Sequence, residues 1–190
     1  MASNPKTYLT PDEYLAIERK AEFKSEYIDG EMVAMTGASR NHNLITINTA
    51  REISQQLKGK PCEAYSSDMR VRIPDTGLYP YPDLVVVCGE PIFEDGYVDT
   101  LTNPTVVIEV LSDSTESYDR GKKFRYYRLI DSLAEYLLIA QDEYRVEHYV
   151  RQPDGRWLLS EVRTLNEQIE LSSISCTLNL KEIYEKVKLP

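Results

Sequence analysis

Two continuous apolar runs in the middle of the chain constrain the fold most strongly. The runs, 84–88 and 106–111, are rich in β-branched residues, which is typical of strands that are buried on both faces of a sheet. Each run carries one acid, because Asp83 directly precedes the first and Glu109 lies inside the second. A carboxylate in such a setting costs stability unless it is paired, hydrogen-bonded or bound to a metal. The two acids are therefore the first candidates for a functional site.

Local signals around these runs predict further helices and strands. Thr10, Pro11 and Glu13 form the pattern of a capping box, so we expect a helix from 11 to about 20. Asp29-Gly30, between two apolar stretches, is typical of a β-hairpin. Other helices are expected over 41–57, 118–130 and 180–186, and other strands over 62–73, 84–88, 104–111, 135–140, 144–150 and 156–162. This order predicts one α/β or α+β domain over residues 1–190, with a mixed central β-sheet flanked by helices.

The composition is that of an ordinary globular protein with a net negative charge. Of the 190 residues, 42% are hydrophobic and 28% are charged, which is enough for a sizeable core. The net charge of −9 argues against broad, sequence-independent binding of nucleic acid, but it leaves room for a locally basic cleft. No apolar run approaches the roughly 20 residues that span a membrane, and residues 1–6 lack the apolar stretch of a signal peptide. We therefore expect a cytoplasmic protein that does not contact the membrane.

The cysteines and histidines show no metal-binding pattern of their own. Cys62, Cys88 and Cys176 are widely spaced and odd in number, so we expect buried free thiols. Two histidines are too few for a His-rich zinc site. His42, near a helix start, either contacts a phosphate or makes a local hydrogen bond, and His148 is expected at the surface.

Lys123 is the cation best placed to join the two acids. At about 100° per residue, it projects onto the middle of the apolar face of the helix 118–130, whereas Lys122 lies at the edge of that face. The apolar neighbours within about 60° of it are Tyr126, Tyr127 and Ile130. Because helical side chains lean toward the helix N-terminus, Lys123 is expected to point back to the end of the preceding strand, where Glu109 lies.

Two carboxylates and a lysine suit a site that cuts phosphodiester bonds. Carboxylate oxygens can hold Mg²⁺, which also keeps several waters. The metal polarises the phosphate and lowers the pKa of a bound water. A nearby ammonium can orient that water or stabilise the extra charge of the transition state. Asp83, Glu109 and Lys123 could instead form a buried ion-pair network that fixes the fold, and their spacing alone leaves both interpretations open.

Longer motifs in the chain resemble a known group of nucleases. Pro82-Asp83, then Glu109 in a buried strand, then a lysine, resembles the PD-(D/E)XK superfamily, which has the restriction-endonuclease-like fold. The chain is more specifically similar to the Uma family of bacterial endonucleases. The segments that carry this similarity are 26–31, 39–42, 108–115 and 135–139, together with Asp119, Lys123 and Tyr127. The resemblance covers about residues 8–185, almost the whole chain.

The resemblance implies a fold, an activity and a ligand set. It implies a restriction-endonuclease-like core and an endonuclease that depends on Mg²⁺ (or Mn²⁺) and hydrolyses DNA. The backbone carbonyl of Val110 would join Asp83 and Glu109 as a metal ligand. Glu26 would approach from the first hairpin as an accessory acid, so that Asp83, Glu109, Lys123 and Glu26 form the expected catalytic set.

The position of the lysine departs from the wider superfamily pattern. There the lysine stands two residues after the acid, where this chain has Leu111. In the Uma family the lysine has moved onto the next helix, which agrees with the inward projection of Lys123. The displaced lysine and the acidic composition also favour an alternative, a non-catalytic nuclease-fold module that binds or regulates. A hydrolase of another phosphate ester is a third hypothesis.

Contacts to DNA are expected from the same helix. Arg120, Lys122 and Arg125 are expected to contact DNA, and with Arg128 they are the nearest approach to a basic patch, although a solvated helix face is the alternative. Arg70 and Arg72 share one face of an expected strand and could extend this patch. Restriction-type folds usually act as dimers because two strands must be cut, so the resemblance implies a homodimer.

Overall fold

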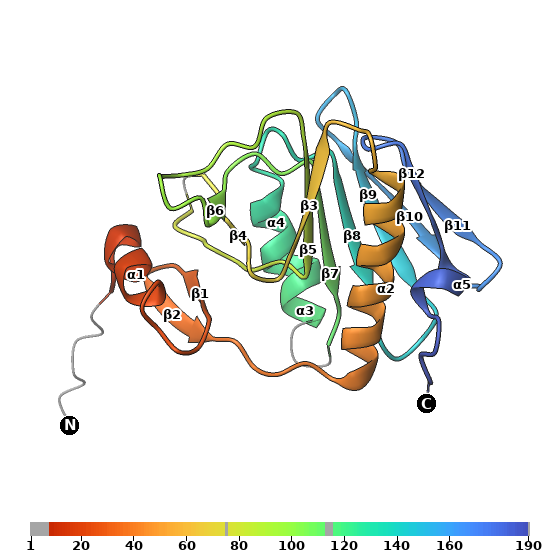
Figure 1. The fold of residues 1–190 in the computed structure, drawn as a ribbon, viewed down its shortest axis with the longest axis horizontal. Helices are drawn as coiled ribbons and strands as arrows, with labels where there is room; N and C mark the ends of the chain where they lie inside the picture. The colour runs from red at the N-terminus through yellow and green to blue at the C-terminus, as the bar shows by residue number, and fades with distance from the viewer. Residues whose placement is uncertain (1–7, 75, 113–115, 190) are drawn as a thin grey trace.

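The computed structural model describes residues 8–74, 76–112 and 116–189 and has a mixed α+β architecture (Figure 1). A central sheet is covered on one face by α2 (Arg40–Gln56) and on the other by the helical segment between β7 and β8. The six strands of this sheet are β3 (Cys62–Ser66), β5 (Leu84–Cys88), β7 (Val106–Val110), β8 (Glu135–Ile139), β9 (Val146–Arg151) and β10 (Trp157–Val162). The expected fold class, a mixed sheet flanked by helices, is confirmed. Among the described residues, no helix combines the length and the hydrophobicity needed to cross a membrane.

The strand order places the two apolar runs, which carry Asp83 and Glu109, side by side. The order is β10-β9-β8-β7-β5-β3, in which β7 and β8 are parallel and the other neighbours antiparallel. A parallel pair needs a crossover connection. The crossover here consists of α3 (Glu116–Tyr118), the π-helical turn η1 (Asp119–Lys123) and α4 (Phe124–Tyr127). The expected helix 118–130 is thus present, but it is interrupted by a π turn.

Side chains of the central strands alternate between two hydrophobic cores, as the pleat requires. The core beneath α2 includes Ile45 and Val86, whereas the core beneath α4 includes Val85 and Tyr127. Both faces of the sheet are therefore covered, which explains why the runs at β5 and β7 are continuously apolar rather than alternating.

A helix and a hairpin form a small unit beside the sheet (Figure 1). The helix is α1 (Pro11–Glu18), and the expected capping box at its start is present. The hairpin consists of β1 (Ser25–Ile28) and β2 (Glu31–Ala34). Asp29 and Gly30 turn the chain with φ values of 52° and 91°. Positive φ at both central residues is what a tight hairpin turn needs, and Asp-Gly is suited to it.

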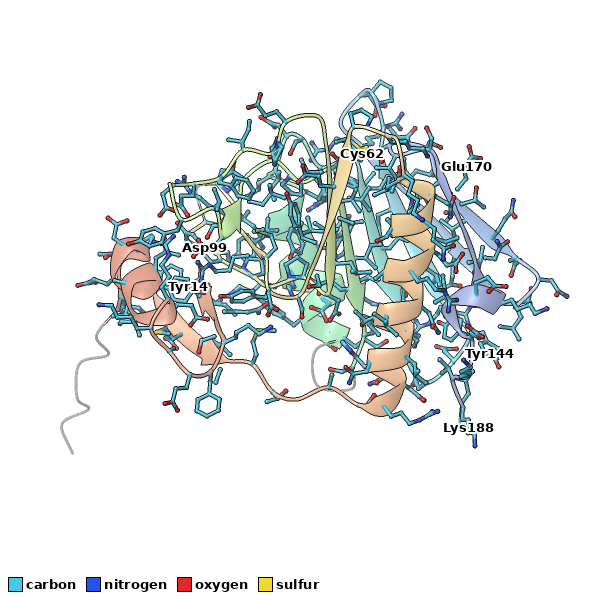
Figure 2. All side chains as sticks on the ribbon, viewed as in Figure 1. Tyr14, Cys62, Asp99, Tyr144, Glu170 and Lys188 are labelled. Carbon is cyan, nitrogen blue, oxygen red and sulfur yellow. A yellow bond between two sulfur atoms is a disulfide. The ribbon has the colours of Figure 1, made fainter. Side chains whose placement is uncertain are left out.

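A cluster of arginines around one aspartate fastens this unit to the rest of the protein. Asp99 Oδ2 lies 2.8 Å from Arg19 Nε, just after α1, and 2.5 Å from Arg70 Nη2. Arg70 Nη1 also donates a hydrogen bond to the Tyr81 hydroxyl over 2.8 Å. Figure 2 shows Asp99 beside α1, in the neighbourhood of Tyr14. The cluster thereby joins the end of α1 to the segments around Arg70 and Asp99.

The segment expected as one strand over 62–73 is divided. After β3 the chain turns and resumes as β4 (Arg70–Val71), which pairs in parallel with β6 (Thr100–Leu101) away from the central sheet. Arg70 is buried in the cluster around Asp99, so the expectation that it extends a basic surface patch is wrong. Arg72 is half exposed, and its Nε lies 3.4 Å from a carboxylate oxygen of Glu94.

The C-terminal region contains a hairpin that the sequence analysis did not predict. Strands β11 (Gln168–Leu171) and β12 (Cys176–Asn179) pair antiparallel and precede the short helix α5 (Leu180–Ile183). Their buried side chains join the core beneath α2. Each strand is only four residues long, but buried and more exposed side chains alternate along both, and the buried ones lie in the core beneath α2.

The structure corrects two expectations about single residues. Cys62 and Cys88 oppose each other on β3 and β5 and form a disulfide, so the expectation of free thiols is wrong for this pair and holds only for Cys176. His148 is buried rather than exposed, and its Nε2 lies 2.5 Å from Glu135 Oε2. Both partnerships join neighbouring strands of the central sheet.

Candidate active site

Asp83 and Glu109 meet where β5 begins and β7 ends. The register that pairs Leu84 with Ile108 carries Asp83 to the position opposite Glu109. Asp83 Oδ2 accepts a hydrogen bond of 2.7 Å from the backbone N–H of Val110, which fixes the carboxylate against the end of β7. Glu109 is only 4% exposed, on the face of the sheet that the helical crossover covers.

Lys123 reaches the acids from the π-helical turn η1. Its Nζ lies 2.9 Å from Glu109 Oε1, 3.2 Å from Glu26 Oε1 and 3.6 Å from Asp119 Oδ1. Lys123 is buried, as its helical projection predicts, whereas Lys122 is exposed. A π turn inserts one residue into a helix, and such turns occur frequently at functional sites. Here the turn brings one ammonium group into contact with three carboxylates.

Neighbouring donors hold the carboxylates around this lysine. The Tyr127 hydroxyl donates a hydrogen bond to Glu109 Oε1 over 3.1 Å. The backbone N–H of Tyr81 donates to Glu26 Oε1 over 3.1 Å, so the hairpin acid is tied to the loop that leads into Asp83 and β5. The expected accessory acid Glu26 therefore lies at the site, although it comes from the separate N-terminal unit.

Burial and neighbouring charges shift the pKa values of Glu109 and Lys123. Burial raises the pKa of Glu109 to about 8, and the charges of Asp119 and Asp83 add to this rise, while Lys123 opposes it. Burial works to lower the pKa of Lys123, but the carboxylates of Glu109 and Glu26 outweigh it and hold the pKa well above its usual value. Lys123 therefore stays cationic, and Glu109 takes up a proton more readily than an exposed glutamate does.

His42 completes the site in a way that the sequence left open. Its backbone N–H donates to the Ser39 side chain over 3.1 Å, which is the local helix-start bond expected for it. Its ring does more, because Nε2 lies 3.3 Å from Asp83 Oδ2. Burial lowers the pKa of His42, but Asp83 and the Val110 backbone outweigh it, so the pKa is raised. The contact joins distant parts of the chain, and no local signal predicts it.

The oxygen atoms at the site fit a hard divalent cation. Among the described residues, neither Asp83 Oδ1 nor Glu109 Oε2 has a hydrogen-bond partner, so each oxygen keeps lone pairs open for a ligand. In the same part of the chain, no group of three or more His, Cys, Asp or Glu side chains is arranged to hold a metal. Two carboxylates and the backbone carbonyl of Val110 suit Mg²⁺, which needs few protein ligands. They do not suit the closed four-ligand set of structural zinc.

The Tyr118 hydroxyl is a buried polar group near the site that the fold leaves unpaired. It has no hydrogen-bond partner within the described ranges. Burial, together with the charge of Glu26, raises the pKa of this phenol, while Lys123 opposes the rise. The group therefore remains a hydroxyl and is available to donate to a water or a substrate oxygen. The sequence analysis did not single out Tyr118.

The three cations expected to contact DNA lie in different settings. Arg120 Nη2 lies 2.6 Å from Glu147 Oε1. Lys122 Nζ lies 2.7 Å from Asp29 Oδ2. Arg125 is exposed and forms no ion pair with any described residue. The expected basic patch is therefore uneven, because two of its four cations, Arg120 and Lys122, are already paired with carboxylates.

A mixed sheet of this topology, with paired acids on adjacent strands and helices on both faces, defines a protein of the restriction-endonuclease-like class. The chain belongs to the Uma2 family, described as "Putative restriction endonuclease", whose family model matches residues 11–181. The resemblance stated from the sequence motifs is thus confirmed, and membership of this family supports a nuclease-type function.

Comparisons with individual proteins agree with this assignment. The chain is 44% identical over 164 residues to "Uncharacterized protein sll1609" of Synechocystis sp., covering 86% of this chain and 93% of that protein. It is 36% identical over 182 residues to "Uncharacterized protein slr1290" of the same organism, covering 96% and 94%. The crystal structure of "a putative nuclease belonging to DUF820" from Anabaena variabilis superposes with a TM-score of 0.75 at 20% identity, covering 95% of this chain and 99% of that one. At that identity, the superposition shows the fold alone.

Proposed function

We propose that the protein is a Mg²⁺- or Mn²⁺-dependent endonuclease that hydrolyses phosphodiester bonds of DNA. The observation that carries the proposal is the meeting of Asp83, Glu109 and Lys123 at one end of the strand pair β5–β7. The nuclease-type family supports it. The open oxygens Asp83 Oδ1 and Glu109 Oε2 and the carbonyl of Val110 would hold the metal, which would supply Lewis-acid activation of the phosphate and of water.

The other residues prepare this site for an anionic substrate. Lys123 places a permanent positive charge beside Glu109, where it can hold the attacking water or stabilise charge that develops on the phosphate oxygens. Glu26 fixes the direction of that ammonium through its 3.2 Å contact. His42 and the Val110 N–H fix Asp83 from two sides, so its free oxygen points in a constant direction.

A plasmid-nicking assay with Mg²⁺ and with Mn²⁺ tests this function. We expect wild-type protein to nick supercoiled DNA, and Asp83→Asn and Glu109→Gln to lose that activity by more than a hundredfold. Asp68→Asn is the matched control, because Asp68 is exposed and pairs only with Lys24 among the described residues. Calorimetric titration with Mn²⁺ gives a second readout, in which Glu109→Gln should abolish binding.

Two outcomes would contradict the proposal. Equal inactivity of wild type and Asp83→Asn on DNA with either metal would remove its main support. Absence of metal binding at millimolar concentration would favour the competing function, a non-catalytic module. In such a module, the charged side chains at the site would only stabilise the fold, namely those of Asp83, Glu109, Lys123 and Glu26.

We also propose that the active form is a homodimer, because cutting both strands of a duplex requires two copies of the site. Light scattering after size exclusion should give twice the 21.9 kDa monomer mass. A monomer mass at working concentration would contradict the dimer without affecting the chemistry proposed for each site.

A further inference from the structure

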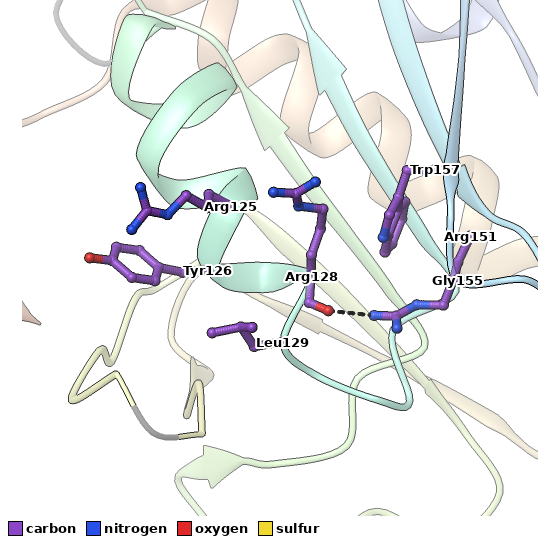
Figure 3. A pocket seen from close by; sticks show the side chains of 7 residues that line it. All are labelled: Arg125, Tyr126, Arg128, Leu129, Arg151, Gly155 and Trp157. Carbon is purple, nitrogen blue, oxygen red and sulfur yellow. Dashed lines mark hydrogen bonds between the residues drawn. The ribbon is translucent and has the colours of Figure 1, made fainter.

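A surface hollow lies on α4 and the adjoining β9–β10 turn, away from the buried face that carries Lys123. It has a volume of about 460 Å³. Its lining residues are Arg125, Tyr126, Arg128, Leu129, Arg151, Gly155 and Trp157. Figure 3 shows the guanidinium groups of Arg125 and Arg128 projecting from one helical turn, with Trp157 and Arg151 across from Arg128. Three arginines and two aromatic rings thus line one hollow.

These arginines differ from most others in the chain because they lack carboxylate partners. Eight arginines lie within 4.0 Å of an acidic side chain, namely Arg19, Arg51, Arg70, Arg72, Arg120, Arg145, Arg156 and Arg163. The four without such a pair among the described residues are Arg40, Arg125, Arg128 and Arg151. Three of these four line the hollow. In a chain of net charge −9, this is a local concentration of unneutralised positive charge.

Arg151 is held rigidly within this group. Its Nε donates to the Leu133 carbonyl over 2.8 Å, and its Nη2 donates to the carbonyls of Arg128 and Ile130 over 2.8 and 2.7 Å. Its guanidinium carbon lies 4.9 Å from the ring centroid of Trp157. The remaining nitrogen, Nη1, has no partner in the described residues and is not an enclosed atom. A guanidinium fixed in this way offers a donor at little further cost in conformational entropy.

We infer that this hollow binds phosphate groups of a nucleic-acid strand at a distance from the cleaved bond. Guanidinium groups match phosphate geometry, and arginines beside aromatic rings suit a strand whose bases stack. Arg125 and Arg128 follow Lys123 by about 3 and 8 Å along the helix axis. The hollow therefore lies toward the end of the sheet opposite the proposed site, where β9 ends and β10 begins. The inference rests on the proposed function, because the proposed nuclease activity is what brings a nucleic-acid strand to the protein.

This assignment narrows the basic patch expected from the sequence. Arg120 and Lys122 are already paired with carboxylates. Arg125 and Arg128 remain, because both are exposed and line the hollow. An acidic segment of another protein is less well matched, because arginine donors beside stacking surfaces suit a phosphate and base better than a flexible carboxylate chain.

DNA binding measured without cleavage tests the inference. Fluorescence anisotropy in EDTA would compare labelled 20-mer DNA, single-stranded and duplex, over a range of salt concentrations. We expect Arg125→Ala/Arg128→Ala to weaken binding at least tenfold and to reduce the slope of log affinity against log salt by about 1.4–1.8, as the loss of two phosphate contacts predicts. Arg163→Ala/Lys181→Ala is the matched control, with the same change of charge at exposed positions outside the hollow, and it should change the affinity less than threefold.

The single tryptophan of the chain provides an independent readout, because Trp157 lines the hollow. Its fluorescence should change on titration with the oligonucleotide and should not change in the Arg125→Ala/Arg128→Ala variant. If inorganic phosphate alone gives the same change and DNA gives none, the ligand is a free anion and the strand assignment is overturned. Both double variants should keep the wild-type unfolding temperature, since all four residues are exposed.

The outcomes separate this inference from the proposed function. The assignment of the hollow is overturned if both double variants weaken DNA binding equally, or if Arg125→Ala/Arg128→Ala keeps the wild-type DNA affinity. Either result leaves the nuclease proposal standing. Loss of binding in that variant alone supports the hollow even if wild-type protein fails to cut DNA. A change of molecular mass in the variant with unchanged DNA affinity assigns the hollow to contact with a second copy of this chain, which also overturns the inference.

Discussion

Lys123 Nζ lies 2.9 Å from Glu109 Oε1, with both side chains almost fully buried between the central sheet and the helical crossover. Glu26 and Asp119 also lie near the same ammonium. The relationship is asymmetric, because the one cation serves three acids. Substitution of Lys123 and substitution of Glu109 should therefore have different effects on stability.

Removal of the lysine should cost far more stability than removal of the Glu109 charge. Lys123→Met leaves three carboxylates without their cation, so we expect a loss of about 3–5 kcal/mol in the free energy of unfolding. Glu109→Gln should cost clearly less, because Lys123 keeps Glu26 and Asp119 and the amide keeps the shape of the side chain. Urea unfolding of both variants measures this difference. Equal losses of unfolding free energy in the two variants would show that Glu26 and Asp119 add no stabilising interaction with Lys123.

His42 should affect metal binding through Asp83. Loss of the ring frees the Asp83 carboxylate on one side, so we expect His42→Ala to weaken Mn²⁺ binding by roughly 10–100-fold, as loss of partners behind metal ligands commonly does. His42→Gln retains a donor and should recover part of the affinity. Calorimetry with Mn²⁺ provides the measurement. Unchanged affinity in His42→Ala would mean that the Val110 N–H alone orients Asp83.

The bond between Cys62 and Cys88 should make stability depend on reductant. It closes a loop with a sequence separation of 26, and a disulfide across a loop of this size stabilises by about 3 kcal/mol through the unfolded chain. Thermal unfolding of wild type should shift downward when dithiothreitol is added. The Cys62→Ser/Cys88→Ser variant should start at that lower value and show no response to the reductant. A response in the variant would point to Cys176 instead.

The cluster around Asp99 should weaken in acid. Hydrogen bonds from Arg19 lower the pKa of Asp99 below its usual 3.8; burial opposes this, and the hydrogen bond and charge of Arg70 add to the lowering. A carboxylate with a depressed folded-state pKa stabilises the fold at pH values above 3.8 and loses this contribution as the pH falls below it. The difference in unfolding free energy between wild type and Asp99→Asn should thus be constant from pH 7 to 5 and shrink toward pH 3. A constant difference down to pH 3 would contradict this assignment.

Features of the fold that depend on neighbouring residues were predicted from the sequence, whereas features that depend on distant partners were not. The capping box at Thr10, the Asp29-Gly30 turn and the apolar runs at β5 and β7 involve neighbouring residues, and all were predicted. The strand expected over 62–73 was too long, because Arg70 turns inward to meet Asp99 rather than continue the sheet. Local propensity carries no information about that distant partner.

By itself, the sequence determined which side chains have to be inside. Acids in apolar runs and a lysine on an apolar helix face need partners, which was sufficient to single out Asp83, Glu109 and Lys123. Only the tertiary structure decided which residues those partners are. The register of β5 against β7 brought Asp83 to Val110, and the packing of α2 over the sheet brought His42 to Asp83. Such contacts depend on closing long loops of chain, and nothing in the local sequence encodes which ends will meet.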